Sequence, residues 1–380
     1  MIYQIVIAVG LALFLVNLIL NFRTLKKPRR NAVVPNPAPL ISVLVPARNE
    51  ESNIRRCLES LRRQDYPNYE VLVLDDGSTD NTAEIVSEIA AKDRRIKLFK
   101  GEPLPGDWVG KTYACHQLAQ KAAGSWLLFV DADTVHEPRM LRGVLELAMQ
   151  KKVTLLSGFP RQLAGSLPLK IIQPVQYYII LGWLPVWLLH KLGKPSLAIG
   201  QFMFFNAQEY RRMGGHEAVR QEIVEDVSLG IEVGKHNGRH VAIDLSPVVS
   251  TEMYVDVGDA WRGFGKSIQG IVAMNPVGIV GLIIAATIFY IMPFWWLWRG
   301  FFVTGAPLLW RSVVLFQVCA MYAMHLMVDL RLREPLISVL FSPVGLAFYI
   351  LNVMWATVRW AMGAGVSWKE RVYGGQQAGK

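Results

Sequence analysis

Residues 41–76 read ISVLVPARNEESNIRRCLESLRRQDYPNYEVLVLDD, and this stretch indicates the fold. Two apolar runs, 41–45 and 70–74, have the length and composition of buried strands, and the segment between them, 51–64, has the spacing of a helix. The alternation continues along the chain, with helices expected at 82–92 and 112–123 and strands at 96–99 and 126–130. Strands that alternate with helices predict an α/β fold with a mostly parallel sheet.

The fourth expected strand ends in the sequence FVDAD, which places two carboxylates at a strand end with one residue between them. Ligands of α/β sheets bind at the carboxyl ends of strands, and hard divalent cations prefer oxygen ligands. Asp131 and Asp133 are therefore candidate ligands of Mg²⁺ or Mn²⁺ on a phosphorylated substrate. Taken alone, the pair also fits two solvated acids that begin a turn.

Polar residues also follow the first two expected strands. The first strand closes in VPARNE, where Pro46, Arg48 and Glu50 can contact a nucleotide. The second ends in DDGSTD, where Asp75 and Asp76 can accept hydrogen bonds from a base or a ribose. A helix N-cap loop is the plain alternative for the second turn. The sequence contains neither a G-x-G-x-x-G turn after a strand nor a P-loop, so dinucleotide and P-loop sites are not indicated.

The composition predicts a chain that is part membrane-embedded and part globular. Of its 380 residues, 52% are hydrophobic and 18% are charged. Residues 1–22 are apolar, long enough to span a bilayer, and lack the basic start and the cleavage site of a signal peptide, so we expect a retained anchor. The linker at 23–39 is basic and rich in proline, which favours a cytoplasmic location for the following domain at 40–270.

The C-terminal region, 277–358, contains about three more apolar segments that could cross a membrane, at 277–298, 301–328 and 336–358. The apolar stretch at 167–190 is interrupted by prolines and crowded with aromatic residues, which favours a segment lying at the membrane interface. We therefore expect a multi-pass protein of the cell membrane. Four full spans would place the basic tail, 359–380, outside, whereas the positive-inside rule places it inside. Either a late apolar run is re-entrant or the stretch at 167–190 enters the bilayer more deeply.

The net charge of +10 is partly explained by these membrane flanks. Because no basic stripe interleaved with aromatic residues is present, we expect no nucleic-acid partner. The three cysteines and seven histidines are scattered without metal-ligand spacing, so a zinc site and a disulfide framework are not indicated, and the histidines are expected on surfaces or loops.

Several motifs in order resemble the family 2 glycosyltransferases. These are VPARNEESNIRRCLESLRRQDYPNYEVLVLDDGSTDNT, GKTYACHQLAQKAAGSWLLFVDAD, the MGGH turn and EIVEDVSL, which together cover most of residues 40–270. The resemblance implies the GT-A fold and an inverting transfer from a nucleotide-diphosphate sugar. Our expectation is therefore an α/β GT-A domain with transmembrane helices at both ends.

The resemblance also implies roles for individual residues. Asp76 would contact the base and ribose, and Asp133 with Asp131 would bind the metal that bridges the diphosphate. Asp226, in the Glu225-Asp226 pair, would be the general base that deprotonates the acceptor. Two adjacent acids at the start of a helix are otherwise usually partners of the helix dipole.

The loop PLPGDWVGK resembles a membrane-bound subgroup that acts on carotenoids, hopanoids, sphingolipids and diacylglycerol. Lys111 in this loop would face a donor phosphate, or is simply a solvated lysine. The Q-x-x-R-W motif of processive synthases is absent, and WRGFGK stands in its place. Its Trp261 and Lys266 would close over the donor phosphates, or belong to an interfacial helix. The tail sequence WKERVY resembles an element of the same subgroup whose role is unassigned.

We therefore expect a membrane enzyme that moves one hexose from a nucleotide-diphosphate sugar to a lipid such as a carotenoid, hopanoid, ceramide or diacylglycerol. UDP-glucose is the donor that we favour, and Mg²⁺ or Mn²⁺ is the expected cofactor. The alternatives are a polyprenyl-phosphate or surface-polysaccharide glycosyltransferase and, less favoured, an inactive nucleotide-sugar-binding scaffold in the membrane.

Overall fold

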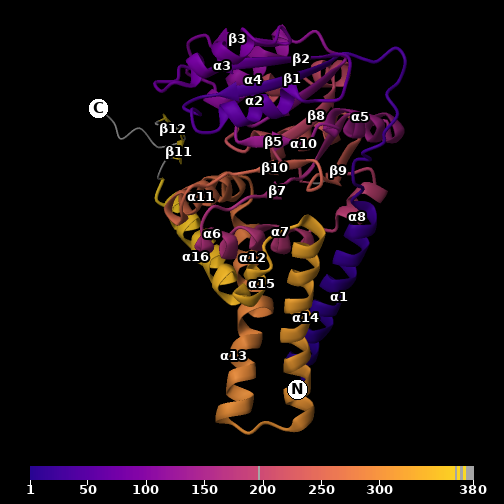
Figure 1. Cartoon of the computed structure of the whole chain (residues 1–380). Helices are drawn as coiled ribbons and strands as arrows, with labels where there is room; N and C mark the ends of the chain where they lie inside the picture. Colours follow the sequence, from indigo (N-terminus) through magenta and orange to yellow (C-terminus); the bar gives the residue numbers. More distant parts are fainter. Residues whose placement is uncertain (196, 364–365, 369–370, 374–380) are drawn as a thin grey trace. The chain divides into compact units, whose positions relative to one another are not determined.

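The computed structural model describes residues 1–195, 197–363, 366–368 and 371–373. The chain forms two compact units (Figure 1). The sheet unit consists of residues 25–161 and 188–253, and the helical unit consists of residues 1–24, 162–187 and 254–380. Lys369 and Glu370 of the WKERVY element, and most of the basic tail, lie outside the described residues.

The sheet unit is built on a seven-stranded sheet with the order β3-β2-β1-β4-β8-β6-β9. Its strands, in chain order, are β1 (Ile41–Ala47), β2 (Tyr69–Asp75), β3 (Ile96–Lys100), β4 (Trp126–Val130), β6 (Leu155–Phe159), β8 (Phe202–Asn206) and β9 (His240–Asp244). Strand β8 is antiparallel to both of its neighbours, and the other neighbouring strands are parallel. The expectation of an α/β fold with a mostly parallel sheet is confirmed.

Helices cover both faces of this sheet. They are α2 (Ile54–Arg62), α3 (Thr82–Ala90), α4 (Gly110–Lys121), α5 (Met140–Lys151), α9 (Ala207–Arg212), α10 (Glu225–Lys235) and the short helix η1 (Gly215–Val219). Side chains of a strand alternate between two cores, as the period of two requires. In β1, Val43 and Val45 belong to one buried cluster, whereas Leu44 belongs to the other. A short antiparallel pair, β5 (Thr134–His136) with β10 (Val249–Thr251), lies beyond β4 in the chain.

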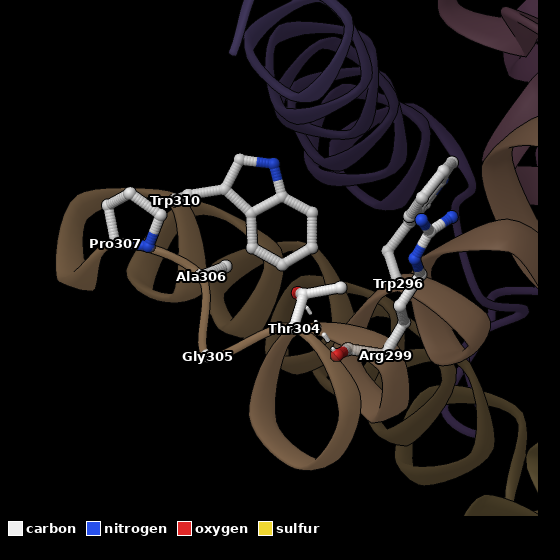
Figure 2. Close-up of a pocket in the computed structure, with 7 residues that line it drawn as sticks. All are labelled: Trp296, Arg299, Thr304, Gly305, Ala306, Pro307 and Trp310. Atoms are coloured by element: carbon white, nitrogen blue, oxygen red, sulfur yellow. Dashed lines mark hydrogen bonds between the residues drawn. The ribbon is translucent and has the colours of Figure 1, made fainter.

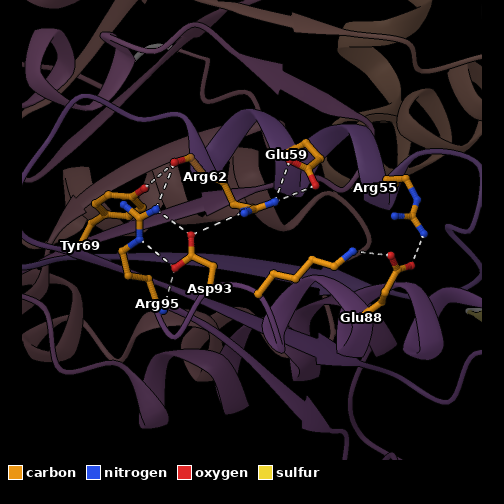
Figure 3. Close-up of polar contacts among 8 residues, drawn as sticks. Arg55, Glu59, Arg62, Tyr69, Glu88, Asp93 and Arg95 are labelled. Atoms are coloured by element: carbon orange, nitrogen blue, oxygen red, sulfur yellow. Dashed lines mark hydrogen bonds and ion pairs between the residues drawn. The ribbon is translucent and has the colours of Figure 1, made fainter.

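A network of ion pairs joins α2 and α3 to the edge of the sheet (Figure 3). Arg55 contacts Glu88 at 2.6 Å, and Arg95 contacts Asp93 at 2.6 Å while its guanidinium lies over the ring of Tyr69. Because most of these groups are exposed, solvent screens the pairs and each adds little to stability.

The linker before β1 is partly attached to the sheet unit. The ammonium of Lys27 lies 3.5 Å from the buried carboxylate of Asp244, and the Asp244 amide donates to the Lys26 carbonyl at 2.9 Å. At least one of the basic residues that we assigned to the membrane flank therefore serves the fold of the sheet unit.

Among its described residues, the helical unit contains four helices that are long and apolar enough to cross a membrane. They are α1 (Ile2–Thr24), the continuous helix 276–303, α14 (Leu308–Leu332) and α16 (Ser342–Ala361). The continuous helix consists of α12 (Pro276–Ala286), η2 (Thr287–Ile291), α13 (Met292–Trp298) and η3 (Arg299–Val303). The other elements of the helical unit are β7 (Arg161–Gln162), α6 (Leu167–Ile172), α7 (Pro174–Trp183), α8 (Val186–Lys191), α11 (Val257–Met274), α15 (Ile337–Leu340), β11 (Val366–Trp368) and β12 (Arg371–Tyr373). Of these, β7 and α8 extend into the sheet unit.

Helices α1 and α14 run in the same direction, and helix 276–303 runs against them. The Gln317 side chain donates to the Gln4 carbonyl at 2.8 Å, and the Arg331 guanidinium lies over the ring of Phe22. In helix 276–303, Phe289 contacts Phe14 at 5.1 Å and Trp296 contacts Tyr3 at 5.9 Å. The end of α1, the end of α14 and the start of α12 therefore lie at one end of the bundle.

Helix α16 begins beside the last turns of α14 and returns toward that same end. His325 and Ser342 are joined by a 2.9 Å hydrogen bond, and Ser338 in α15 donates to the Asp329 carboxylate. Further along α16, the Asn352 side chain donates to the Trp261 carbonyl of α11, the helix that leads into α12. The α15–α16 segment therefore folds back beside α14 within the helical unit (Figure 1).

The stretch at 167–190 folds into the short helices α6, α7 and α8, and the buried Asn21 of α1 holds the end of α7. The Asn21 side chain donates to the carbonyls of Leu181 and Leu184, each at 2.8 Å, and accepts from the Trp187 amide. The last carbonyls of a helix lack partners within the helix, so these bonds satisfy groups that would otherwise be orphaned in an apolar setting.

A pocket of about 500 Å³ lies at the turn between η3 and α14 (Figure 2). Trp296, Arg299 and Trp310 line it, and the Thr304 hydroxyl donates to the Arg299 carbonyl at 3.3 Å. Gly305 has φ +55°, a left-handed conformation that favours glycine. The glycine thus allows the tight turn on which the pocket is built.

Candidate active site

Five of the predicted donor-binding residues lie where β1 and β2 end, namely Pro46, Arg48, Glu50, Asp75 and Asp76. Arg48 donates from its guanidinium to the Asp76 carbonyl at 2.7 Å, and the Asp76 amide donates to the Ala47 carbonyl at 2.8 Å. Pro46 lies one residue before the end of β1, directly opposite Leu74. The two turns are therefore fixed against each other by backbone and side-chain bonds, as expected for adjacent strands of a parallel sheet.

The first two acids of the DDGSTD turn, Asp75 and Asp76, differ in their surroundings. The Asp75 carboxylate accepts a hydrogen bond from the Ser78 amide at 3.1 Å, which is a turn-forming contact. Asp76 is buried at the strand end. Glu50 accepts a bond from the Asn53 side chain at 3.1 Å, and its amide donates to the Thr82 hydroxyl at 2.8 Å. Part of each predicted donor motif therefore serves the local fold.

Lys111 links the end of β4 to the start of α10. Its ammonium lies 2.7 Å from the Asp131 carboxylate and 3.1 Å from the Glu225 carboxylate. Burial alone would lower the pKa of Lys111, but the two acids outweigh it and hold this pKa well above its ordinary value. The lysine is therefore a charged and largely buried bridge between two carboxylates, and the solvated-lysine alternative does not describe it.

Asp133 is an ionisable group in a site crowded with negative charge. Burial first, and then the carboxylates of Asp131 and Glu50, raise the pKa of Asp133 to about 7. Its Oδ1 atom is buried and has no hydrogen-bond partner among the described residues. A divalent cation would relieve both the repulsion and the unsatisfied oxygen.

The described residues contain no group of three or more His, Cys, Asp or Glu side chains arranged to hold a metal ion. Two carboxylates at a strand end nevertheless suit Mg²⁺ or Mn²⁺, because these ions take oxygen ligands and often share them with substrate phosphates. The side chains of Asp131 and Asp133 thus fit an ion held jointly with a diphosphate.

Asp226 lies in the first turn of α10, and the backbone fixes both of its carboxylate oxygens. The Gly200 amide donates to Oδ2 at 2.7 Å and the Val227 amide donates to Oδ1 at 2.8 Å. Burial first, and then the neighbouring Glu225, raise the pKa of Asp226 to about 6, although Lys111 acts in the opposite direction. A carboxylate of fixed orientation whose pKa lies close to neutrality has the properties of a general base.

Some residues near this site were not singled out as functional from the sequence. His216, in the MGGH turn, is fully buried rather than exposed, and it forms a 2.6 Å hydrogen bond with the Tyr210 hydroxyl. Burial lowers the pKa of His216 to about 3, so the ring is neutral. Gly214 and Gly215 adopt left-handed conformations, and the turn that they form brings the His216 ring into the core. A pair of glycines in a sequence is only a weak indication of such a turn.

Trp261 and Lys266 belong to α11 of the helical unit. The Trp261 ring packs against Phe348 at 5.2 Å and Trp355 at 5.6 Å, both on α16. These contacts give Trp261 a packing role between two helices. The role of either residue toward donor phosphates stays a prediction.

Residues 42–170 match the family described as glycosyl transferase family 2. The chain is 31% identical over 192 residues to a 4,4'-diaponeurosporenoate glycosyltransferase of Staphylococcus haemolyticus, covering 50% of each chain. It is 27% identical over 230 residues to the protein of the same name from Staphylococcus aureus, covering 56% of each chain. The matches thus span about half the length of these curated relatives.

Among solved structures, the chain is similar to a mannosyltransferase from Pyrobaculum calidifontis, determined in complex with GDP-Man and Mn²⁺. The TM-score is 0.53 and the identity is 19%, and the match covers 95% of this chain and 98% of that one. This similarity shows that the two chains share a fold.

Residues 42–170 therefore carry a family 2 glycosyl transferase domain, and the expected GT-A fold is confirmed. The resemblance inferred from the motifs is correct for this domain.

Proposed function

We propose that the chain transfers a single hexose from UDP-glucose to the carboxyl or hydroxyl group of a carotenoid-type membrane lipid, with inversion. The observation that carries the proposal is the Asp226 carboxylate. Its orientation is fixed by two amides, and burial first, then Glu225, raise its pKa to about 6. Lys111 connects its neighbour Glu225 to Asp131, which follows β4. The names of the curated relatives favour an acceptor that ends in a carboxyl group.

Each group has a step in this reaction. Asp76 accepts hydrogen bonds from the base or ribose of the donor. Asp133, with Asp131 nearby, would hold the divalent ion, which supplies positive charge to the departing diphosphate. Asp226 removes the proton from the acceptor oxygen, which then attacks the anomeric carbon from the side opposite the diphosphate. One such displacement inverts the anomeric configuration.

Asp226 serves both kinds of acceptor. An alcohol must lose its proton as it attacks, and a carboxylic acid at an apolar surface keeps its proton to higher pH than in water. An ester product is cleaved by mild alkali, whereas a glycoside of an alcohol survives it. Alkaline treatment of the product therefore distinguishes the two acceptor classes.

We further propose that α1, helix 276–303 and α14 cross the cell membrane and that α16 returns to the side from which α14 emerges. Support comes from the helix directions and from the His325–Ser342 bond. The basic residues after α1 and the basic tail then share the cytoplasmic side, which agrees with the positive-inside rule. The sheet unit would lie on that side as well.

Cysteine labelling tests this topology. Thr304→Cys and Met362→Cys, each placed in a Cys319→Ala background, report opposite faces of the membrane. Both positions are exposed, and Cys57 and Cys115 are buried. An impermeant maleimide should label Thr304→Cys in intact cells and Met362→Cys only after permeabilisation. Labelling of both positions in intact cells would show that α16 crosses.

A labelled-donor assay on membranes tests the activity. UDP-[¹⁴C]glucose should give a label that extracts into organic solvent as a neutral or ester-linked glycolipid. A lipid-phosphate sugar or an alcohol-insoluble polymer would instead support the alternative polyprenyl-phosphate or polysaccharide activities. Donor binding with no transfer to any lipid would support the inactive scaffold.

A further inference from the structure

Lys111 makes two ion pairs that its sequence position did not suggest. It is the second residue of α4, where a positive charge is disfavoured by the helix dipole. A lysine at such a position requires compensating negative charge. The compensation comes from Asp131, which follows β4, and from Glu225, which begins α10.

The geometry also limits what Lys111 can do for a donor. Its side chain is 17% exposed, and its ammonium lies within 3.1 Å of a carboxylate oxygen on each of two elements. An ammonium has three donors, and two of them are directed at these oxygens. Breaking both pairs to reach a phosphate would leave the buried Glu225 carboxylate without this cation, a strongly unfavourable change.

We propose that Lys111 is a positioning residue that holds the Glu225-Asp226 pair in place for proton transfer, rather than a ligand of the donor phosphates. Glu225 and Asp226 are adjacent in the first turn of α10, so fixing the Glu225 carboxylate fixes the turn that orients Asp226. The bridge to Asp131 anchors this turn to the strand end at which the donor would bind. The proposal rests on the proposed function, because it assigns a part in that reaction.

The charges that face Asp226 give the proposal a distinctive signature. On α10, Glu225 raises the pKa of Asp226, and from α4, Lys111 lowers it. The amides of Gly200 and Val227 also lower it. Removing the lysine charge should therefore move the titration of the base to higher pH, whereas removing the Glu225 charge should move it to lower pH.

The test compares Lys111→Gln, Lys111→Arg and Glu225→Gln in the full-length chain in membranes. UDP-glucose is the donor, or whichever of UDP-glucose, UDP-galactose and GDP-mannose the wild type turns over. Lys111→Gln should lower kcat by at least about tenfold, leave KM for the donor within about twofold, and shift the acidic limb of the pH profile upward. Lys111→Arg should recover most of the rate, and Glu225→Gln should shift the limb downward.

Lys121→Gln is the matched control, because Lys121 is a lysine of the same helix whose ammonium lies over the Phe99 ring instead of contacting these acids. Its kinetics should equal those of the wild type. If Lys111→Gln fails to fold, as circular dichroism would reveal, the other two variants still decide the matter. Lys111→Arg should keep the wild-type acidic limb, whereas Glu225→Gln should shift it to lower pH.

A KM for the donor raised tenfold or more in Lys111→Gln, with kcat and the acidic limb unchanged, would overturn the proposal and make Lys111 a phosphate ligand. Unchanged kcat, KM and limb would also overturn it. These outcomes require an active wild type, so they are separate from a failure of the proposed function, in which the wild type itself forms no product.

Discussion

Replacing Asp226 by Asn should abolish catalysis without destabilising the protein. The substitution removes the only proton acceptor that we assign to the acceptor oxygen, and loss of a general base lowers rates by about 10²- to 10⁴-fold. The side chain keeps its size, and its remaining oxygen can still accept one of the two amide hydrogen bonds from Gly200 and Val227.

The stability argument follows from the raised pKa. The difference between about 6 in the folded protein and the ordinary 3.8 means that ionised Asp226 disfavours folding at pH 7 by about 3 kcal/mol. Because the folded pKa lies above the unfolded one, this penalty is present at neutral pH and disappears as the pH falls through 6 toward 4. Asparagine removes the penalty and loses one amide bond worth about 1–3 kcal/mol, so the net change at pH 7 is near zero or stabilising.

Two assays check this prediction. Sugar transfer by membranes measures the activity, and thermal unfolding at pH 7 measures the stability. For the wild type, the same pKa predicts a rate at pH 5 about tenfold below its plateau, which would not occur if the base had the ordinary pKa of an aspartate. An Asp226→Asn variant that unfolds well below the wild-type temperature, or that keeps more than a tenth of the activity, would refute the reasoning.

Two further predictions concern the fold. In Gly158→Ala, the new Cβ would lie 2.1 Å from the Ile243 carbonyl oxygen of β9, so the strands must separate and stability should fall by about 3 kcal/mol or more in denaturant unfolding. Gly106→Ala, with no atom within 4 Å of the new Cβ, should change it by less than about 1 kcal/mol, and equal losses in the two variants would contradict the packing argument. Asn21→Ala should lower the stability of the helical unit by about 1–2 kcal/mol, because the carbonyls of Leu181 and Leu184 then keep only the longer bonds from Asn17, at 3.3 and 3.4 Å. An unchanged melting temperature in detergent would show that the Asn21 bonds are dispensable.

The sequence was sufficient to predict the first half of the sheet unit. The strands and helices expected between residues 41 and 130 agree with β1 to β4 and α2 to α4 within a few residues, because each apolar run is bounded by turn residues. The second half was not predicted, since β8 is an antiparallel strand inserted between parallel ones and its pairing partners are distant in the chain. Periodicity indicates that a strand exists but not its place or direction in a sheet.

The candidate site was predictable as a set of residue types but not as a set of contacts. Asp131 and Asp226 stand out because acids follow a strand or begin a helix. Lys111 connects Asp131 to Glu225, the neighbour of Asp226, and this connection depends on the approach of residues that are 20 to 114 positions apart in the chain, which no local pattern encodes. The burial of His216 could not be predicted for the same reason, because it depends on the turn made by two glycines.

The direction of α16 was also left open by its sequence. An apolar run of this length fits either a span or a re-entrant segment. The polar contacts of His325 and Asp329 with the α15–α16 segment support the re-entrant arrangement that we propose. These contacts involve side chains whose partners lie up to 17 residues away.

The central claim is tested most directly by mass spectrometry of membrane lipids from cells that contain a carotenoid carboxylic acid and express either the wild-type chain or Asp226→Asn. With UDP-glucose present, the account predicts a carotenoid product heavier by one hexose in wild-type membranes and none, or a trace, with the variant. The absence of any hexose-bearing lipid from wild-type cells, or equal amounts of it from the variant, would contradict the account.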